Sequence, residues 1–406
     1  MSTLSERILG APAGSYVDRR VDVAFAHDGT GVLALETLRA MGNPGIACPE
    51  RVHLIFDHIA PANTGMTALL QKELREFAAS CGCGFSDVGG GICHQVMSEG
   101  IVLPGLIVVG ADSHTCTLGA FGAFATGVGA TDMAAIWASG STWFRVPETI
   151  ALHLSGAFSG AAEPKDAALA YVGRLGMDGA TYRALEFVGD GAAGISMAGR
   201  LTLCNMAVEA GAKAGMFYAD PVTIRYLADL GIAADPQVPQ DCCYERTVDI
   251  DLSDLVPLVA VPHRVDNVRE AAALAGTRLD QVFVGTCTNG RFEDLRRFAR
   301  IVRGKKVATR TIVIPASRAV LQEAVGTGVL ADIIAAGCIV GTPGCGPCLG
   351  THAGVIGEGE VCLSTANRNF KSRMGVGGEI YLSSVATAAV SALAGEIAVP
   401  EEEDVR

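Results

Sequence analysis

Three cysteines in two glycine-rich segments have the types and spacing that could bind an inorganic centre. Cys287 lies in the segment Gly-Thr-Cys-Thr-Asn-Gly, and Cys345 and Cys348 form a Cys-Gly-Pro-Cys pair. A cubane iron–sulfur cluster is held by cysteine thiolates, so three ligands would leave one iron without a protein ligand. An open metal position supports Lewis-acid chemistry on a substrate, as it does at catalytic zinc sites.

Other interpretations of the cysteine pair remain open at this point. A Cys-x-x-Cys pair also occurs at zinc sites and in thiol–disulfide enzymes. A redox dithiol is expected just after a strand and at the start of a helix. Here Gly344, Gly346, Pro347 and Gly350 indicate a stiff loop instead. The sequence therefore favours a metal cluster over a redox pair or structural cysteines.

Imidazole and polar side chains are adjacent in four segments of the N-terminal part. These segments are His27-Asp28, Asp57-His58, His94-Gln95 and Asp112-Ser113-His114. A neighbouring carboxylate orients an imidazole and raises its basicity, as acid–base catalysis requires. Taken singly, each pair is more often a surface or helix-capping group. A nucleophilic serine is disfavoured, because no Gly-x-Ser-x-Gly sequence surrounds Ser113.

Two further segments carry candidate substrate-binding groups. Asn205 and Glu209 are four residues apart and share one face if that segment is helical. Arg368 and Arg373 follow Asn367, and arginine binds carboxylates through two parallel hydrogen bonds. A helix cap, an ordinary surface glutamate and salt-bridged surface arginines are the alternatives.

The elements that must position these groups alternate between strand and helix patterns. Short apolar runs at 106–109, 281–284 and 311–314 each end at a polar or Gly/Pro-containing segment, and Ile339-Val340 leads into the Cys345 loop. Asn289 is a candidate N-cap for a helix beginning near Phe292. Ligands of parallel α/β sheets gather beyond the carboxyl ends of the strands. We therefore predict an α/β fold of three-layer α/β/α domains with mainly parallel sheets.

Length and composition limit the remaining possibilities. The chain has 406 residues, and its 50 glycines are about 12% of them, above the usual level of roughly 7%. We predict three α/β domains, approximately 1–130, 131–265 and 266–406, with the active site at their junction. The segments 221–241 and 261–267 are the best linker candidates.

The charge and the cysteine content indicate which partners the protein could bind and in which compartment it works. A formal net charge of −12 and 6% aromatic residues disfavour nucleic-acid binding. The uncharged stretch 113–131 contains four glycines and several hydroxyl groups, so we interpret it as buried loop and helix, with no membrane span. The N-terminus has no signal-peptide pattern, and the 13 cysteines are expected to be reduced thiols in the cytoplasm.

Taken together, these segments resemble the aconitase family of iron–sulfur hydro-lyases. Within it they look most like the large subunit of 3-isopropylmalate dehydratase and its archaeal-type relatives, including homoaconitase. The resemblance runs from about residue 20 to about 385, in family order. The segments that carry it are His27-Asp28-Gly29-Thr30, Phe56-Asp57-His58, Cys93-His94-Gln95, Gly110 to Thr115, Cys204-Asn205-Met206, the Cys287 and Cys345/Cys348 segments, and Asn367 to Arg373.

The resemblance implies a role for each group. Cys287, Cys345 and Cys348 would ligate a 4Fe–4S cluster with one open iron. Proton transfer and catalysis would fall to Asp57, His58, His94, Asp112, His114 and Glu209. Substrate binding would fall to His27, Ser113, Asn205, Asn367, Arg368 and Arg373, with His27 standing where aconitases proper carry another polar residue.

The resemblance also implies a partner and a reaction. Single-chain aconitases end in a swivelling domain that supplies the catalytic base, and this chain stops at Arg406 without one. We expect a separate small subunit that carries this domain in a hetero-oligomer, and negligible isomerase activity from the chain alone. The expected reaction is dehydration and rehydration of a 2-hydroxy acid.

Several substrates and functions remain open. Conversion of 2-isopropylmalate to 3-isopropylmalate in leucine biosynthesis is the first choice, and homocitrate, citramalate or citraconate, and dimethylmalate are the alternatives. An electron-transfer iron–sulfur protein would need a fourth cysteine ligand, for which Cys338 and Cys362 are the nearest candidates. RNA binding by a cluster-free form is disfavoured by the negative charge.

Overall fold

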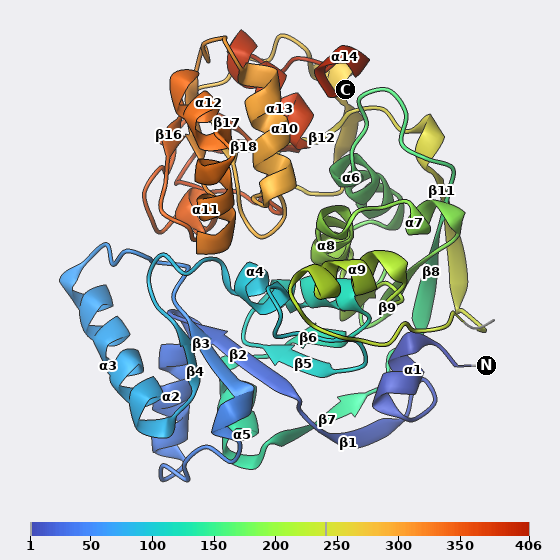
Figure 1. Ribbon diagram of the computed structural model, residues 1–406, viewed down its shortest axis with the longest axis vertical. Helices are drawn as coiled ribbons and strands as arrows, with labels where there is room; N and C mark the ends of the chain where they lie inside the picture. Colours follow the sequence, from blue (N-terminus) through green and yellow to red (C-terminus); the bar gives the residue numbers. More distant parts are fainter. Residues whose placement is uncertain (1, 240–241, 406) are drawn as a thin grey trace.

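The computed structural model describes residues 2–239 and 242–405, which form three α/β units arranged around a common centre (Figure 1). The first unit contains a five-stranded sheet of order β4-β3-β2-β5-β6, and all of its strand pairs are parallel. Its strands are β2 (Val23–His27), β3 (Val52–Ile55), β4 (Gly84–Ser86), β5 (Ile107–Gly110) and β6 (Phe124–Gly127), and its helices are α2 (Thr30–Ala40), α3 (Gly65–Cys81), α4 (Cys93–Ser98) and α5 (Ala130–Ser139).

Both faces of this first sheet are covered. Along β2, Phe25 packs into one buried cluster with Val108, whereas Ala24 and Ala26 pack into another with α2 and α5. Alternate side chains of a strand point to opposite faces, so burial on both sides produces the apolar runs seen in the sequence. The prediction of a three-layer arrangement with a parallel sheet is confirmed here.

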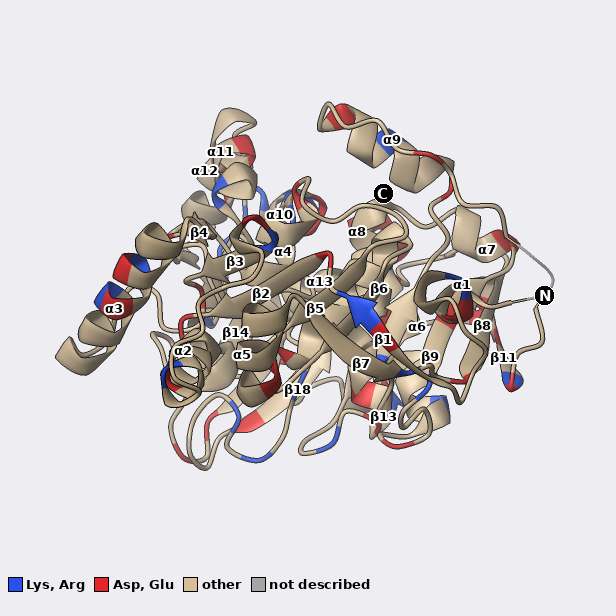
Figure 2. Ribbon diagram, turned by 90° about the horizontal axis from the view of Figure 1, so that it is seen from below, with Lys and Arg blue, Asp and Glu red and all other residues tan. Residues whose placement is uncertain are grey.

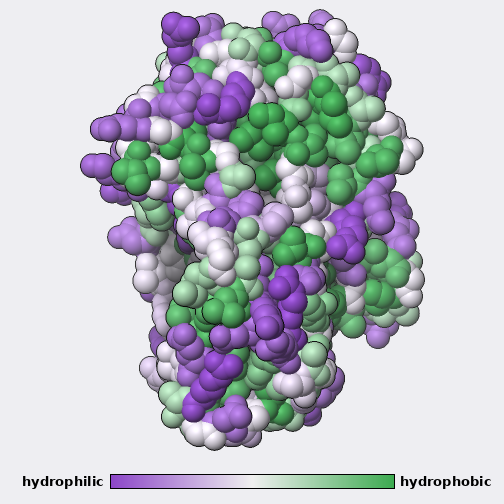
Figure 3. Space-filling view, turned by 90° about the vertical axis from the view of Figure 1, so that its left-hand side faces the viewer, coloured by the Kyte–Doolittle hydropathy of each residue, from purple (hydrophilic) through white to green (hydrophobic). Residues whose placement is uncertain are grey.

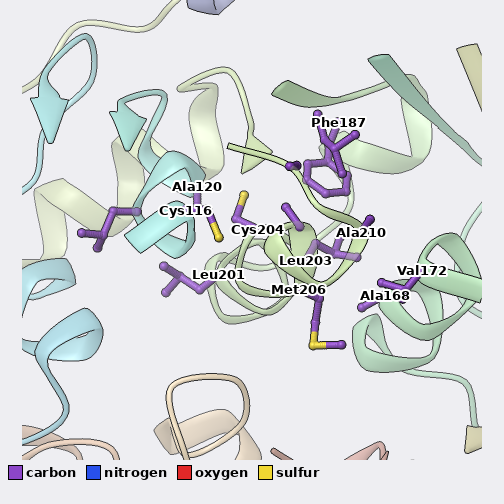
Figure 4. Close-up of a cluster of buried hydrophobic side chains, with 14 of the residues drawn as sticks. Cys116, Ala120, Ala168, Val172, Phe187, Leu201, Leu203, Cys204, Met206 and Ala210 are labelled. Atoms are coloured by element: carbon purple, nitrogen blue, oxygen red, sulfur yellow. The ribbon is translucent and has the colours of Figure 1, made fainter. Parts of the chain in front are cut away.

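The second unit has a parallel four-stranded sheet of order β10-β9-β8-β11. Its strands are β8 (Thr149–Ser155), β9 (Ala184–Val188), β10 (Ala214–Met216) and β11 (Arg246–Asp251), and its helices are α6 (Pro164–Leu175), α7 (Asp190–Ala193), α8 (Met197–Met206) and α9 (Pro221–Asp229). Helix α8 lies in the centre of the molecule, where Leu201, Cys204 and Met206 are buried near Cys116 and Phe187 (Figure 4). This packing holds the neighbouring Asn205 in a fixed position.

The third unit has a seven-stranded sheet of order β13-β12-β18-β17-β14-β15-β16, parallel from β18 to β16 and antiparallel at β12 and β13. Its strands are β12 (Leu258–Ala260), β13 (Val268–Glu270), β14 (Gln281–Val284), β15 (Arg310–Val313), β16 (Ile339–Val340), β17 (Val361–Ser364) and β18 (Glu379–Ser383). Its helices are α10 (Phe292–Val302), α11 (Arg318–Gly326), α12 (Val329–Ala335), α13 (Val385–Ala394) and α14 (Glu402–Val405).

An antiparallel ribbon joins β1 (Tyr16–Arg20) to β7 (Ser141–Arg145), and helix α1 (Leu4–Leu9) lies near its start. Acidic and basic residues are interspersed on outer helices such as α3 (Figure 2). Apolar side chains gather on the upper part of the face shown in Figure 3. The exposed apolar residues of the third unit include Ile334, Ile339 and Val355.

Some details differ from the sequence predictions. The N-cap of α10 is Arg291 rather than Asn289, and the Asp294 carboxylate accepts its backbone N–H at 3.0 Å. The segment 221–241, of which residues 240 and 241 lie outside the described part of the chain, begins with α9. The segment 261–267 turns between the paired strands β12 and β13, so neither prediction corresponds to a simple linker. The predicted domain boundaries near residues 130 and 265 stay a prediction. Two strand pairs cross them: β7 pairs with β1, and β12 pairs with β18. Across the described residues, every helix is too short or too polar to cross a membrane.

A buried glutamate attaches the N-terminal helix to the second unit. Glu186 on β9 is 0% exposed and accepts hydrogen bonds from the Leu4 backbone N–H at 2.6 Å and the Tyr244 hydroxyl at 3.1 Å. Burial raises the pKa of Glu186 from 4.5 to about 7, while these two hydrogen bonds act in the opposite direction. The folded protein therefore retains a proton that the unfolded chain loses between these pH values.

The Glu186 carboxyl group predicts a specific pH dependence of stability. Because the pKa of Glu186 is higher in the folded state, its contribution to the free energy of unfolding is complete below pH 4.5 and is lost as pH rises through 7. This contribution is roughly 3 kcal/mol at most. Glu186→Gln should remove this dependence and still accept the Leu4 hydrogen bond. The measurement is the thermal midpoint at pH 5 and pH 8. An unchanged difference between the two midpoints in the variant would contradict the assignment.

Candidate active site

Most of the predicted site residues come from strand ends in the first and third units and meet at one cavity. Its volume is about 260 Å³. Residues following β2, β5, β14, β16 and β17 line it, so the carboxyl ends of strands from both sheets face each other there. The lining residues are His27, Thr30, His58, Ile92, His94, Ala111, Asp112, Ser113, His114, Thr286, Cys287, Cys345, Cys348, Leu349, Asn367, Arg368 and Arg373.

Asp112 lies among four histidines. Its Oδ1 is 3.3 Å from Nε2 of His94, and its Oδ2 is 3.5 Å from Nε2 of His58 and 3.8 Å from Nε2 of His27. Oδ1 also accepts the backbone N–H of His114 at 2.7 Å, because Asp112 caps the short 3₁₀ helix Ser113–Phe121. One carboxylate thus orients several imidazoles.

Asp57 supports His58 from the interior. Its Oδ1 lies 2.6 Å from Nδ1 of His58, and its Oδ2 accepts the backbone N–H of Cys93 at 2.7 Å. Burial acts to lower the pKa of His58, but the charge and hydrogen bond of Asp57, together with the charges of Asp112 and Asp28, raise that pKa to about 9. Burial acts to raise the pKa of Asp57, yet the charge and hydrogen bond of His58, with smaller contributions from His27 and the Cys93 backbone N–H, lower it to about 2. The pair therefore consists of the His58 imidazolium and the Asp57 carboxylate. Nε2 of His58 faces Asp112.

His27 stacks on His58 and has a different character. The ring centroids are 3.6 Å apart, and burial together with the His58 charge lowers the pKa of His27 to about 4. Its Nδ1 accepts the backbone N–H of Gly29 at 3.1 Å. His27 is therefore neutral, with the proton on Nε2, which faces Asp112.

The sequence analysis did not assign a role to Asp28, which the structure shows to be a positioning group. Its buried carboxylate accepts the backbone N–H groups of Asp57, His58 and Ile59 at 3.3, 2.9 and 2.9 Å. Gln71 on α3 donates to the same carboxylate at 3.2 Å. This hydrogen bonding fixes the loop that carries the Asp57–His58 pair. The only sequence signal was its position beside His27.

The three cysteines line the same cavity and are almost fully buried. The Cys287 loop bends sharply, since Thr286 has φ of 77°, and a Cβ at Gly285 would lie 2.9 Å from the Ile314 carbonyl oxygen. The Cys345 loop is attached to the first unit, because the Cys345 backbone N–H donates to the Asp57 carbonyl at 2.8 Å. Tertiary contacts therefore bring together thiols that are about 60 residues apart in sequence.

Amide groups surround the Cys287 sulfur in a way that suits a thiolate. Nδ2 of Asn205 lies 3.2 Å and Nδ2 of Asn367 lies 3.4 Å from Cys287 Sγ. Burial acts to raise the pKa of Cys287, but His94 outweighs it and lowers that pKa to about 6. Oδ1 of Asn367 is buried without a hydrogen-bond partner among the described residues. This donor set and the unpaired oxygen fit a thiolate-bound, electropositive centre.

Glu209 lies behind the cavity lining. Its Oε1 is 2.7 Å from Nε2 of His114 and accepts Nε of Arg368 at 2.8 Å. Both partners line the cavity, whereas Glu209, Asn205 and Asp57 do not. Glu209 therefore orients an imidazole and a guanidinium, and the expected direct contact with substrate stays a prediction. The remaining predicted site residues all line the cavity.

The chain is similar in sequence to known proteins over nearly its whole length. The sequence profile described as the aconitase family (aconitate hydratase) matches residues 5–274 and 265–395. A probable methanogen homoaconitase large subunit from Methanosarcina mazei is 52% identical over 94% of this chain and 99% of its own length. A 3-isopropylmalate dehydratase large subunit from Elusimicrobium minutum is 47% identical over 98% of this chain and 99% of its own.

A solved structure supports the fold at a greater distance. The crystal structure of Thermococcus kodakaraensis aconitase X (holo-form) superposes with a TM-score of 0.54 at 12% identity, covering 86% of this chain and 84% of that one. This similarity concerns the fold alone.

Proposed function

The chain belongs to the aconitase family, and from this premise we propose that it is the large, iron–sulfur subunit of a hydro-lyase. The reaction is the isomerisation of a 2-hydroxy di- or tricarboxylate by dehydration and rehydration. One observation carries the proposal: three buried cysteines, four histidines, two arginines and Asp112 line a single cavity.

The cavity residues fit a 4Fe–4S cluster held by Cys287, Cys345 and Cys348. The amides of Asn205 and Asn367 donate toward Cys287, which stabilises a thiolate ligand. When bound, such a cluster supplies an open iron that acts as a Lewis acid on the substrate hydroxyl group. Hydroxide is a poor leaving group, so this assistance addresses the main difficulty of dehydration.

The protein's own groups handle protons and negative charge. His58, held as an imidazolium by Asp57 and facing Asp112, is positioned to give a proton to the departing hydroxyl oxygen. His94 and His114 border the same cavity and can exchange protons with a substrate bound there. Proton removal next to a carboxylate builds charge that Arg368 and Arg373 stabilise. We assign the base that removes this proton to the partner subunit.

The cavity composition supports an alkylmalate as the first substrate choice. Arg368 and Arg373 match two carboxylates. Ile92, Ala111 and Leu349 offer apolar contacts for an alkyl group. We therefore propose 2-isopropylmalate, converted to 3-isopropylmalate in leucine biosynthesis.

A homoaconitase-type activity is the second candidate, and the 52% identical relative from Methanosarcina mazei favours it. A tricarboxylate needs a third cationic or hydrogen-bonding group beyond the two arginines. The partner subunit would have to provide that group. Comparing 2-isopropylmalate with homocitrate as substrates of the assembled enzyme separates the two candidates, and citramalate and dimethylmalate complete the series.

The relatives' names imply a small-subunit partner in a hetero-oligomer. We propose that this subunit carries the swivelling domain and closes over the cavity, and that the enzyme works in the cytoplasm. None of the described cysteines forms a disulfide bond, which suits a reducing compartment. Because the catalytic base is assigned to the small subunit, the pure chain should bind substrate but turn it over negligibly.

The direct test is anaerobic reconstitution with iron and sulfide, followed by electron paramagnetic resonance with and without 2-isopropylmalate. The expected result is a cluster whose signal changes when the acid is added, because substrate reaches an open iron. Homocitrate is the parallel probe for the second candidate. Failure to assemble any cluster would remove the proposal, and a cluster that ignores every hydroxy acid would favour the electron-transfer alternative.

A further inference from the structure

A buried lysine does not line the cavity, but it hydrogen-bonds to the backbone of a loop that carries lining residues. Lys165 is 1% exposed and is the second residue of α6, in the second unit. Two features make this position unfavourable for a cation. A buried ammonium group loses its hydration, and the first turn of a helix carries the positive end of the helix dipole.

The carboxylates of the same helical turn are used elsewhere. Asp166 accepts the backbone N–H groups of Glu163 and Leu258, each at 2.8 Å. Glu163 pairs with Arg297 and accepts the backbone N–H of Ala386 at 2.7 Å. Among the described residues, Lys165 takes part in no ion pair, and its two hydrogen bonds go to backbone carbonyl groups.

Those carbonyl groups belong to the third unit. The Lys165 ammonium donates to Thr365 O at 2.8 Å and to Ala366 O at 2.7 Å. These two residues immediately follow β17 and immediately precede Asn367 and Arg368. Because two adjacent carbonyl oxygens are held by one group, the direction of the chain entering Asn367 is fixed.

Thr365 extends the same connection to the Cys287 loop. Its hydroxyl group contacts the backbone N–H of Gly285 at 3.1 Å and the carbonyl oxygens of Gly285 and Asn289 at 3.2 and 3.3 Å. Gly285 and Asn289 flank Cys287 on both sides. A displacement of Thr365 would therefore move the Cys287 loop together with Asn367 and Arg368.

Charged groups of the site act on the Lys165 amine. Burial lowers the pKa of Lys165 to about 7, and the charges of Asp294, Cys287, Asp166 and Cys348 act in the opposite direction. Two of these four groups are proposed cluster ligands, so Lys165 and the proposed cluster site influence each other.

We infer that Lys165 is a positioning residue of the active site, which holds the Thr365–Ala366 carbonyls and so sets Asn367, Arg368 and the Cys287 loop. The inference rests on the proposed function for its substrate and cluster readouts. Its structural part concerns this chain's own backbone and can be tested without the cluster.

The experiment compares Lys165→Met with Glu163→Gln in the full chain. Glu163 lies in the same helical turn and joins the same third unit, but through α13 and α10 rather than through the site loops. In cluster-free protein, Lys165→Met should raise amide exchange in segments 284–290 and 365–370 at least tenfold, whereas Glu163→Gln should leave these segments near wild type.

Reconstituted protein adds two readouts that a merely structural contact would not move selectively. The Lys165→Met cluster should have a shifted reduction potential, because the Cys287 loop and its amide donors are displaced. Its affinity for 2-isopropylmalate, followed by electron paramagnetic resonance, should fall at least tenfold, with Glu163→Gln within threefold of wild type. If Lys165→Met does not fold, Lys165→Gln, which is neutral but can donate to one carbonyl, takes its place.

Equal exchange in the two variants would overturn the inference. So would an unchanged potential and affinity in Lys165→Met protein that carries a full cluster. If wild-type protein forms no cluster, the proposed function fails, while the exchange comparison still decides whether Lys165 positions these loops.

Discussion

Replacing Cys287 by serine is expected to lower the iron and sulfide content of the reconstituted chain at least about tenfold, because a hydroxyl group is a poor cluster ligand and two thiolates alone hold a cubane weakly. The same result is expected for Cys345→Ser and Cys348→Ser. Cluster absorbance and iron and sulfide analysis after anaerobic reconstitution provide the measurement. All three sulfurs border one cavity, so each loss should be nearly complete.

Matched controls come from the cysteines nearest in sequence. Cys338 packs in the core of the third unit, and Cys362 on β17 packs on the other side of the sheet near Gln281. Neither lines the cavity. Cys338→Ser and Cys362→Ser should therefore retain the cluster. Loss of the cluster in either variant, without unfolding, would indicate a fourth protein ligand and revive the electron-transfer interpretation.

Replacing Asp112 by asparagine is expected to lower turnover by about 10²- to 10⁴-fold, the range typical of a lost acid–base group. Asparagine keeps the shape and can still accept the backbone N–H of His114. It removes the negative charge that lies within 3.3 to 3.8 Å of nitrogen atoms of His27, His58 and His94. The imidazoles would then lose the common acceptor that orients them. The assay is dehydration of 2-isopropylmalate by the reconstituted chain with its small subunit.

The Asp112→Asn variant should still assemble the cluster and should still show a spectral change with substrate, since its three cysteine ligands are unaltered. Asp254→Asn is the matched control, because Asp254 is exposed and lies outside the cavity. Turnover within threefold of wild type in Asp112→Asn would exclude a central role for this carboxylate. Loss of the cluster in this variant would show that its role is structural.

Much of the architecture was predictable because it depends on local patterns. The predicted strand at 281–284 occurs as β14 (Gln281–Val284), and the predicted strand at 311–314 occurs one residue earlier as β15 (Arg310–Val313). Apolar runs buried on both faces make such strands recognisable in the sequence. The polar segments after them could be recognised as ligand-binding loops because the carboxyl ends of parallel strands face the site. The helix boundary was predicted less well: the N-cap of α10 is Arg291 rather than Asn289, and the Asn289 amide donates to the Asp294 carboxylate instead.

The sequence by itself determined which chemical groups are available and that they follow strand ends. Only the tertiary structure decided their arrangement: Glu209 orients His114 and Arg368 from behind, Asp28 holds the Asp57 loop, and Lys165 holds the chain before Asn367. Each of these contacts joins residues at least 30 positions apart. Local propensity carries no information about such pairs, because a hydrogen bond between distant segments exists only after three packed sheets have fixed the separation of their ends.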